Sequence, residues 1–298
     1  MVSSLEIVSA EVQRTIMSEM ERIGLLFRFF SRAKSQDSIF AKIAKKKYVE
    51  KGKKLQDAIG FRIVVYFTDD IELVITILKK LFAVNNEEID TPNEDTFRPK
   101  RTNIVFDLPS DSTGPFKSAF AEEHRSLIDQ TFEVQVRSVL SEGWHEVEHD
   151  LRYKCQEDWV KNADLSRALN GIYASLENSD WSMLKIFQDL SHRAYKSKEW
   201  SIMLRNKLRL RIKNQALSSQ LEEYLQMNNS VAKKIYRTER SEFMKCLLKS
   251  RLSIPLTFDN CIFVINYAFI GDSALHSLAS PFIRQEIEDF ITSVESLN

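Results

Sequence analysis

The spacing of apolar residues along the chain predicts several amphipathic helices. In the first of them, Val12, Ile16 and Met20 recur four residues apart, which places them on one helical face. The second begins near Asp37 or Ser38, because a short polar side chain at an N-cap accepts a hydrogen bond from the first turn. Helices of this kind are predicted over residues 5–31, 36–50, 70–83 and 139–153.

Short runs of β-branched and aromatic residues predict three strands among these helices. The acidic stretch over residues 84–98 is predicted to be a loop, and the residues from Pro109 to Gly114 have the chemistry of a turn. The predicted strands cover residues 63–67, 103–108 and 131–138.

Beyond about residue 155 the pattern is almost wholly helical, although the apolar run over 261–270 fits a strand as well as a helix. We place a domain boundary near residue 195, which gives domains 1–195 and 196–298. The predicted fold class is α+β, with a mixed β-sheet flanked by helices and an all-helical C-terminal region. That region shows no recognisable chemistry. We interpret it as a regulatory or oligomerisation domain, and a homo-oligomer is therefore one expected assembly.

Charge, cysteine content and the absence of targeting segments add three inferences. The whole chain is balanced at 42 basic and 42 acidic residues, but residues 1–62 carry 13 Lys+Arg against 7 Asp+Glu, which favours an anionic partner such as a nucleotide or RNA. The 3 cysteines are widely spaced and predict neither a disulfide framework nor a cysteine zinc site. The sequence has no signal-peptide pattern and no apolar run long enough for a bilayer, so we expect a cytoplasmic protein without a membrane partner.

The third predicted strand carries the most informative polar residues. Alternation places Glu133, Gln135 and Arg137 on one face, and apolar residues on the other. Asp57 directly precedes the first strand, so the two carboxylates of Asp57 and Glu133 can hold one Mg²⁺ if these strands are neighbours. Cations around such a pair are typical of phosphoryl-type transfer. The candidate cations are Arg32, Lys34, Lys42, Arg62 and Arg137.

Three motifs combine these residues at specific spacings. They are Arg32-x-Lys34-x-x-x-Ser38-x-x-x-Lys42, Asp57-x-x-Gly60-x-Arg62-x-x-x-x-Phe67, and Glu133-x-Gln135-x-Arg137-Ser138 with Trp144, Glu148-His149 and Tyr153-Lys154 after it. Together they resemble the synthetase domain of the RelA/SpoT family, the ATP:nucleotide pyrophosphokinases that make the alarmones ppGpp and pppGpp in the stringent response. The resemblance covers about residues 5–195 and implies a nucleotidyltransferase-like mixed sheet flanked by helices.

The resemblance also implies an activity: transfer of the β,γ-pyrophosphate of ATP to the 3′-hydroxyl of GTP or GDP, with Mg²⁺ as cofactor and AMP as the second product. Asp57 and Glu133 would hold Mg²⁺, and Glu133 would also draw the proton from the acceptor hydroxyl. Arg32 and Arg62 would stack on adenine, where a planar guanidinium is favourable. The remaining implied residues are Lys34, Ser38 and Lys42 for the donor phosphates, and Gln135 and Arg137 for orienting the transferred group.

The acceptor part of the chain departs from the family pattern. The family's acceptor loop reads roughly GYRSLH, and here the corresponding residues are 98–103, with Pro99 near the place of the base-stacking Tyr and Asn103 near that of the His. Glu142 stands where the family has an Asn that reads guanine, and its carboxylate could accept hydrogen bonds from guanine N1 and N2. An adenosine nucleotide or the 3′ end of a tRNA is the alternative acceptor. The expected acceptor-binding residues are Lys100, Arg101, Asn103, Glu142 and His149.

Two other hypotheses compete with the pyrophosphokinase. Residues 145–149 form a literal HExxH motif, in which His145 and His149 could bind the zinc of a metallopeptidase, with Glu146 as base and Glu157 or Glu177 as the nominal third ligand. A catalytically inactive nucleotide-binding module is the other hypothesis. The divergent acceptor segment favours it, whereas the complete set of donor residues speaks against it.

Overall fold

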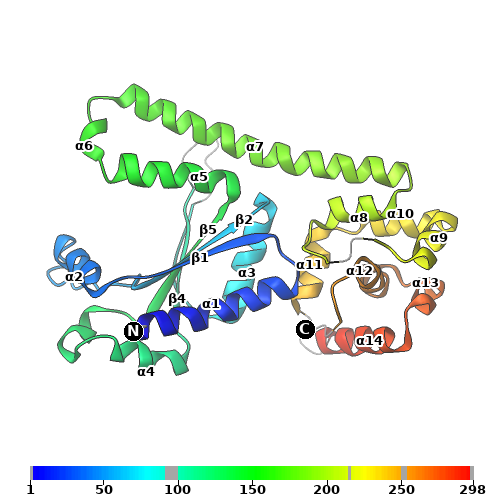
Figure 1. Ribbon diagram of the computed structural model, residues 1–298, viewed down its shortest axis with the longest axis horizontal. Helices are drawn as coiled ribbons and strands as arrows, with labels where there is room; N and C mark the ends of the chain where they lie inside the picture. The colour runs from blue at the N-terminus through cyan, green and yellow to red at the C-terminus, as the bar shows by residue number, and fades with distance from the viewer. Residues whose placement is uncertain (1–2, 91–99, 214–215, 250–253, 296–298) are drawn as a thin grey trace. The chain divides into compact units, whose positions relative to one another are not determined.

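The chain forms two compact units, which are described separately here. The first comprises residues 1–19 and 27–181, and the second comprises 20–26 and 182–298. The units divide within α7 (Ala163–Lys196), and the domain boundary predicted near residue 195 stays a prediction. The computed structural model describes residues 3–90, 100–213, 216–249 and 254–295 (Figure 1).

A five-stranded sheet forms the centre of the first unit. Its strands lie in the order β1-β2-β5-β4-β3, with β2 and β5 parallel and the other neighbours antiparallel, so the predicted mixed sheet is confirmed. The bounds are β1 (Phe27–Ala33), β2 (Ile59–Val65), β3 (Val84–Ile89), β4 (Thr102–Asp107) and β5 (Thr131–Ser138).

Helices flank this sheet, and in Figure 1 α5 lies on the opposite side of the sheet from α1 and α4. Short 3₁₀ turns over Thr68–Asp70 and Glu122–Leu127 and a π-helical turn over His149–Tyr153 complete the first unit. The helices that precede α7 are α1 (Ser4–Arg22), α2 (Gln36–Lys45), α3 (Ile71–Leu81), α4 (Ser110–Ser118), α5 (Val139–Glu148) and α6 (Gln156–Trp159).

One face of the sheet is apolar, and its aromatic rings build the core. Phe132 on β5 stacks on Phe106 of β4 with ring centroids 5.6 Å apart, and it meets Phe82 edge-on at 5.0 Å. Phe61 on β2 joins the same cluster at 5.6 Å from Phe132. Because side chains alternate along a strand, the residues between these aromatic residues point to the opposite face of the sheet. We call this opposite face the polar face.

The first helix ends earlier than predicted. Gly24 has a φ of +72° and ends α1 in a Schellman motif: Gly24 donates to the Glu21 carbonyl (3.0 Å) and Leu25 donates to the Met20 carbonyl (3.1 Å). The residues from Phe27 onward form β1, so the prediction of one helix over 5–31 was wrong beyond Arg22. The apolar residues within 25–30 continue the helical spacing of the preceding segment. For this reason β1 was not predicted.

Other local predictions need correction. The predicted loop over 84–98 begins with strand β3, and residues 91–99 lie outside the described residues. The predicted turn at 109–114 is the start of α4. The N-cap of α2 is Ser35, whose Oγ accepts from the Ser38 backbone N–H at 3.3 Å, and not Asp37 or Ser38. The ambiguous run at 261–270 is helical.

The second unit is helical in every regular element that the structure describes, as predicted. Its core contains the fully buried rings of Trp200, Phe243 and Phe258. No helix in the described part of the chain is long and apolar enough to cross a membrane. The helices are α8 (Trp200–Leu208), α9 (Ser219–Met227), α10 (Asn229–Arg237), α11 (Arg240–Lys249), α12 (Phe258–Ile265), α13 (Ser273–Leu278) and α14 (Pro281–Glu295), with a π-helical turn over Asn266–Ile270.

Candidate functional site

The parallel pairing of β2 with β5 brings the two predicted metal carboxylates to one place. Gly60 is the Cα partner of Glu133, and Asp57 lies just before β2. Both carboxylates line a cavity of about 240 Å³ on the polar face. The expectation that their strands are neighbours is therefore confirmed.

The strand register places the other candidates in two rows across the polar face. Donor-side residues lie on β1 and β2, and acceptor-side residues lie beyond β5, on β4 and β3. The first row is Arg32, Gly60, Glu133, Val105 and Asn86, and the second row is Phe30, Arg62, Gln135, Asn103 and Glu88.

Asp57 is paired with two lysines from the donor motif. Lys34 and Lys42 both donate to Asp57 Oδ2, the second at 2.5 Å. Burial alone would raise the pKa of Asp57, but the hydrogen bonds from both ammonium groups outweigh burial and hold the pKa below its usual range. Ser38 lies one turn before Lys42 on α2 and is exposed, so α2 presents both residues on one side of a helix.

Glu133 is in the opposite electrostatic situation. Burial raises the pKa of its carboxyl above the usual range, and the negative charge of Asp57 raises it further. Asn103 Nδ2 donates to Glu133 Oε1 at 3.3 Å, which is a long hydrogen bond. Two carboxylates that line one cavity are a donor set that fits a divalent cation, because hard cations prefer such oxygens.

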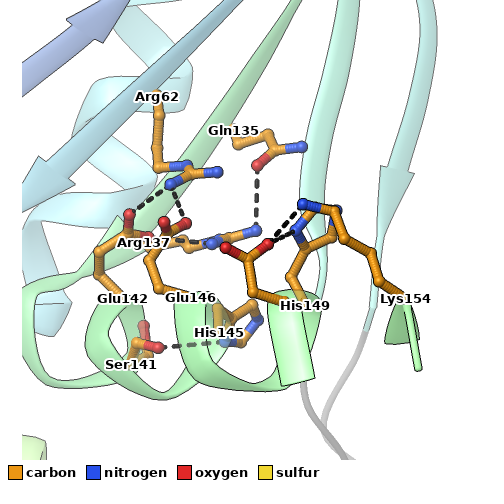
Figure 2. Close-up of polar contacts among 10 residues, drawn as sticks. Arg62, Gln135, Arg137, Ser141, Glu142, His145, Glu146, His149 and Lys154 are labelled. Carbon is orange, nitrogen blue, oxygen red and sulfur yellow. Dashed lines mark hydrogen bonds and ion pairs between the residues drawn. The ribbon is translucent and has the colours of Figure 1, made fainter. Parts of the chain in front are cut away.

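Glu142 joins two arginines of the polar face, as Figure 2 shows. Its Oε1 accepts from Arg62 Nη1 at 2.7 Å, and its Oε2 accepts from Arg137 Nη1 at 2.9 Å. Arg137 also donates to Gln135 Oε1 at 3.0 Å, and Arg62 donates to Glu146 as well. Burial would lower the pKa of Arg62, but Glu142 raises it, so the guanidinium is fixed as a cation.

One polar atom in this cluster is left without a partner. The Nε of Arg62 is buried and makes no hydrogen bond to the described residues. Buried donors of this kind are rare in native proteins and mark positions where a ligand or water completes the hydrogen bonding.

The HExxH histidines have partners other than a metal. His145 Nδ1 contacts the Ser141 carbonyl at 3.1 Å, and burial lowers the pKa of His145 to about 4. His149 Nδ1 lies 2.9 Å from Asp150 Oδ1 on the exposed π-helical turn (Figure 2). No group of three or more His, Cys, Asp or Glu side chains in the described ranges is placed to hold a metal.

The predicted acceptor-binding residues do not come together. Lys100 pairs with Glu177, one of the nominal zinc ligands, and Arg101 pairs with Asp90 and with Glu88, the latter at 3.1 Å. Glu142 belongs to the arginine cluster, and His149 is exposed. Of these five predicted residues, Asn103 lines the cavity.

Residues that the sequence did not single out line the same cavity. None belonged to a motif: Tyr48 fell inside a predicted helix, and Asn86 and Glu88 fell inside a predicted loop. Phe30, assigned to the apolar stripe of a helix, lies beside Arg62 on the polar face and is 52% exposed. The cavity residues missed by sequence are Tyr48, Lys54, Gln56, Asn86, Glu88 and Val105.

Comparisons with known proteins give one family and several structures. Residues 31–158 match the model of the region found in RelA / SpoT proteins. The chain is similar to small alarmone synthetase 1 from Bacillus subtilis (19% identity, TM-score 0.43, covering 61% of this chain and 89% of that one). It is also similar to a GTP pyrophosphokinase family protein from Streptococcus pneumoniae (20%, 0.45, 61% and 86%) and to small alarmone synthetase 2 from Bacillus subtilis (22%, 0.42, 59% and 89%).

A comparison with curated proteins gave no match. The family match spans every predicted site residue, from Arg32 to His149. The chain thus carries a RelA/SpoT region over residues 31–158, and the resemblance inferred from its motifs is confirmed there.

Proposed function

We propose that this protein is an ATP-dependent pyrophosphokinase that transfers the β,γ-pyrophosphate group of ATP to the 3′-hydroxyl of a guanosine nucleotide. One observation carries the proposal: Asp57 and Glu133 line one cavity on neighbouring parallel strands, with the cations of the donor motif beside them. The family match over residues 31–158 supports the same class of reaction.

The donor nucleotide would lie over β1 and β2. Arg32 and Arg62 occupy adjacent rows of these two strands, so their guanidinium groups can reach one adenine ring. Lys34 and Lys42 converge on Asp57, next to the place where the phosphates must meet the carboxylate pair. Ser38 would add a hydroxyl donor to the phosphates from the same helix.

Asp57 and Glu133 would hold Mg²⁺, which when bound supplies positive charge that neutralises the triphosphate. Lys34 and Lys42 would then leave Asp57 and donate hydrogen bonds to phosphate oxygens instead. Gln135 and Arg137, which contact each other at 3.0 Å on the same strand, would orient the transferred group. Positioning and electrostatics of this kind supply most of the catalysis in phosphoryl-type transfer.

Glu133 would accept the proton of the acceptor hydroxyl. The 3′-oxygen forms a bond to the β-phosphorus of ATP, the bond from that phosphorus to the bridging oxygen of the α-phosphate breaks, and AMP leaves with the bridging oxygen. The raised pKa of Glu133 suits this role, because a base with a higher pKa takes up a proton more readily.

The test is AMP release from ATP and Mg²⁺, assayed separately with GDP, GTP, ADP, ATP and bulk tRNA as acceptor. We expect AMP with a guanosine nucleotide, and a loss of roughly 100- to 1,000-fold in Glu133→Gln. Glu72→Gln, which changes an exposed carboxylate on α3, is the matched control and should keep full activity. Full activity of Glu133→Gln would contradict the proposal.

A second acceptor is favoured by one observation. Lysines gather in and after α2, close to the cavity that Lys54 lines. A polynucleotide would contact such a cluster through several phosphates, so transfer to the 3′ end of a tRNA is the second candidate. AMP formed with tRNA but not with mononucleotides, and suppressed steeply by salt, would establish it. The lysines are Lys45, Lys46, Lys47, Lys51, Lys53 and Lys54.

Metal analysis separates the zinc hypothesis from the pyrophosphokinase. We expect protein purified without chelator to contain no stoichiometric zinc, and His149→Ala to leave its metal content unchanged. Stoichiometric zinc that disappears in His149→Ala would favour a metallopeptidase instead. A cytoplasmic location and a homo-oligomeric assembly stay predictions.

A further inference from the structure

The cavity beside the carboxylate pair has one aromatic wall. Tyr48 is the aromatic side chain among the described residues that line the cavity, and it is half-buried. Its backbone is fixed on both sides: Tyr48 N–H donates to the Ile43 carbonyl (3.1 Å), and its own carbonyl accepts from the Lys53 N–H (2.9 Å). Tyr48 is therefore held in place at the cavity by the turn that ends α2.

The cavity extends from Lys42 and the carboxylate pair toward β4 and β3. Beyond Glu133 it is lined by Asn103 of β4 and by Asn86 and Glu88 of β3, whereas the donor arginines lie on β1 and β2. A nucleoside bound at the end of the cavity formed by β4 and β3 would approach Glu133 from the side away from Arg32 and Arg62, whereas Lys42 lines the end next to the donor phosphates. Transfer with the attacking and leaving oxygens in line requires this arrangement of two substrates.

The lining of the cavity suits a guanine base. Glu88 is held by a hydrogen bond from Arg101 to its Oε2 at 3.1 Å, which leaves Oε1 as an acceptor. A carboxylate accepts hydrogen bonds from the N1–H and N2–H₂ groups of guanine, whereas adenine presents an unprotonated N1 to the same group. The side chains of Asn86 and Gln56 add amide donors and acceptors, and Lys54 adds a cation for a phosphate.

We propose that the guanine base of the acceptor stacks on Tyr48 and is read by Glu88. This inference rests on the proposed function and gives it an acceptor subsite that this chain builds from the turn after α2 and from β3. The ring is supplied by a different segment from the one expected by resemblance, where the chain has Pro99. Base stacking on one aromatic side chain changes the affinity for a nucleotide by roughly 5- to 150-fold.

The experiment compares Tyr48→Ala, Tyr48→Phe and Glu88→Gln, with Val49→Ala as matched control, because Val49 is the next residue and is exposed. Tyr48→Ala should raise KM for the guanosine acceptor roughly 5- to 150-fold and leave KM for ATP unchanged. Tyr48→Phe should restore acceptor affinity, because it keeps the ring. Glu88→Gln should reduce the preference for GDP over ADP by a similar factor.

Direct binding separates this inference from the proposed function. GDP affinity is measured by calorimetry in the Glu133→Gln background, where no turnover interferes, with thermal unfolding as the check that each variant is folded. Weaker GDP binding in Tyr48→Ala supports the subsite. If the wild type formed no AMP with any acceptor, the proposed transfer would be overturned, but weaker GDP binding in Tyr48→Ala would still support the subsite. Unchanged GDP binding and acceptor KM in folded Tyr48→Ala would overturn the subsite.

Discussion

The guanidinium groups of Arg62 and Arg137 are held by the two oxygens of one carboxylate, that of Glu142, at 2.7 and 2.9 Å. Arg62 lies on β2 and Arg137 on β5, so Glu142 fixes the two cations across neighbouring strands. Sequence resemblance pointed to Glu142 as a reader of the acceptor base. Its contacts instead favour the role of a positioning residue for Arg62 and Arg137.

Glu142→Ala should therefore weaken both stability and donor binding. Two partly buried cations lose their shared partner, which should cost about 1–3 kcal/mol of unfolding free energy. KM for ATP should rise while KM for the acceptor stays unchanged. Urea denaturation and steady-state kinetics measure both effects. The matched control is Glu146→Gln, whose half-exposed carboxylate contacts Arg62 alone, and it should show a clearly smaller loss.

Glu133→Gln should lose most of its activity and yet be more stable than the wild type at neutral pH. Because the folded-state pKa of Glu133 is raised, its contribution to stability is present below the unfolded pKa and is lost as the pH rises through the folded pKa. Removing this charge therefore gives a higher Tm at pH 7.5 and no gain near pH 4. A lower Tm at pH 7.5 would show that the Glu133 charge is stabilised in the protein.

Asp57→Asn should have the opposite effect on stability. The pKa of Asp57 is lowered, so its contribution is present above the unfolded pKa and is lost as the pH falls through the folded pKa. At neutral pH, the variant leaves Lys34 and Lys42 close together without their carboxylate. We expect a lower Tm at pH 7.5 and near-complete loss of AMP release. Equal Tm values for the two proteins would contradict the ion pairing.

Gly60→Ala tests the open space on the polar face. A Cβ at Gly60 meets no atom within 4 Å, so the chain should fold, with a gain of about 0.5–1 kcal/mol because alanine loses less backbone entropy than glycine in a strand. The new methyl would stand between Arg32 and Glu133, where the proposed function places substrate phosphates and metal. Activity should fall at least about tenfold. Gly114→Ala, which also meets no atom within 4 Å, should leave activity unchanged.

Local patterns in the sequence were enough to predict β5, the strand that contains Glu133, Gln135 and Arg137. The alternation of Glu133, Gln135 and Arg137 with buried Phe132 and Val134 predicts one polar face, and the structure has it. Whether Asp57 lies close to Glu133 depends on the pairing of β2 with β5. No local sequence pattern determines strand pairing, so the sequence predicted this proximity only on the condition that the two strands are neighbours.

Two strands were missed because their local signals point elsewhere. β1 follows a glycine that breaks the helix, but its apolar residues continue the helical spacing. β3 is an edge strand whose residues are all exposed, so burial imposes no alternation on Val84–Ile89. The partners of Glu142 and the position of Tyr48 at the cavity are tertiary contacts between distant segments, and the sequence has no local sign of either.

The pairing of Asp57 with Lys34 and Lys42 has a consequence for the order in which substrates assemble. Free Mg²⁺ would have to displace two ammonium groups from Asp57, and free ATP would draw those lysines away from a carboxylate left without a counter-ion. Each ligand binding alone breaks the ion pairs of Asp57 with Lys34 and Lys42. When both bind, Mg²⁺ pairs with Asp57 and the phosphates pair with the two lysines. Metal and nucleotide should thus bind with positive cooperativity, measurable as a Kd for a non-hydrolysable ATP analogue that falls as Mg²⁺ rises. The lysine pair would then make the protein respond to the magnesium complex of the nucleotide rather than to either component.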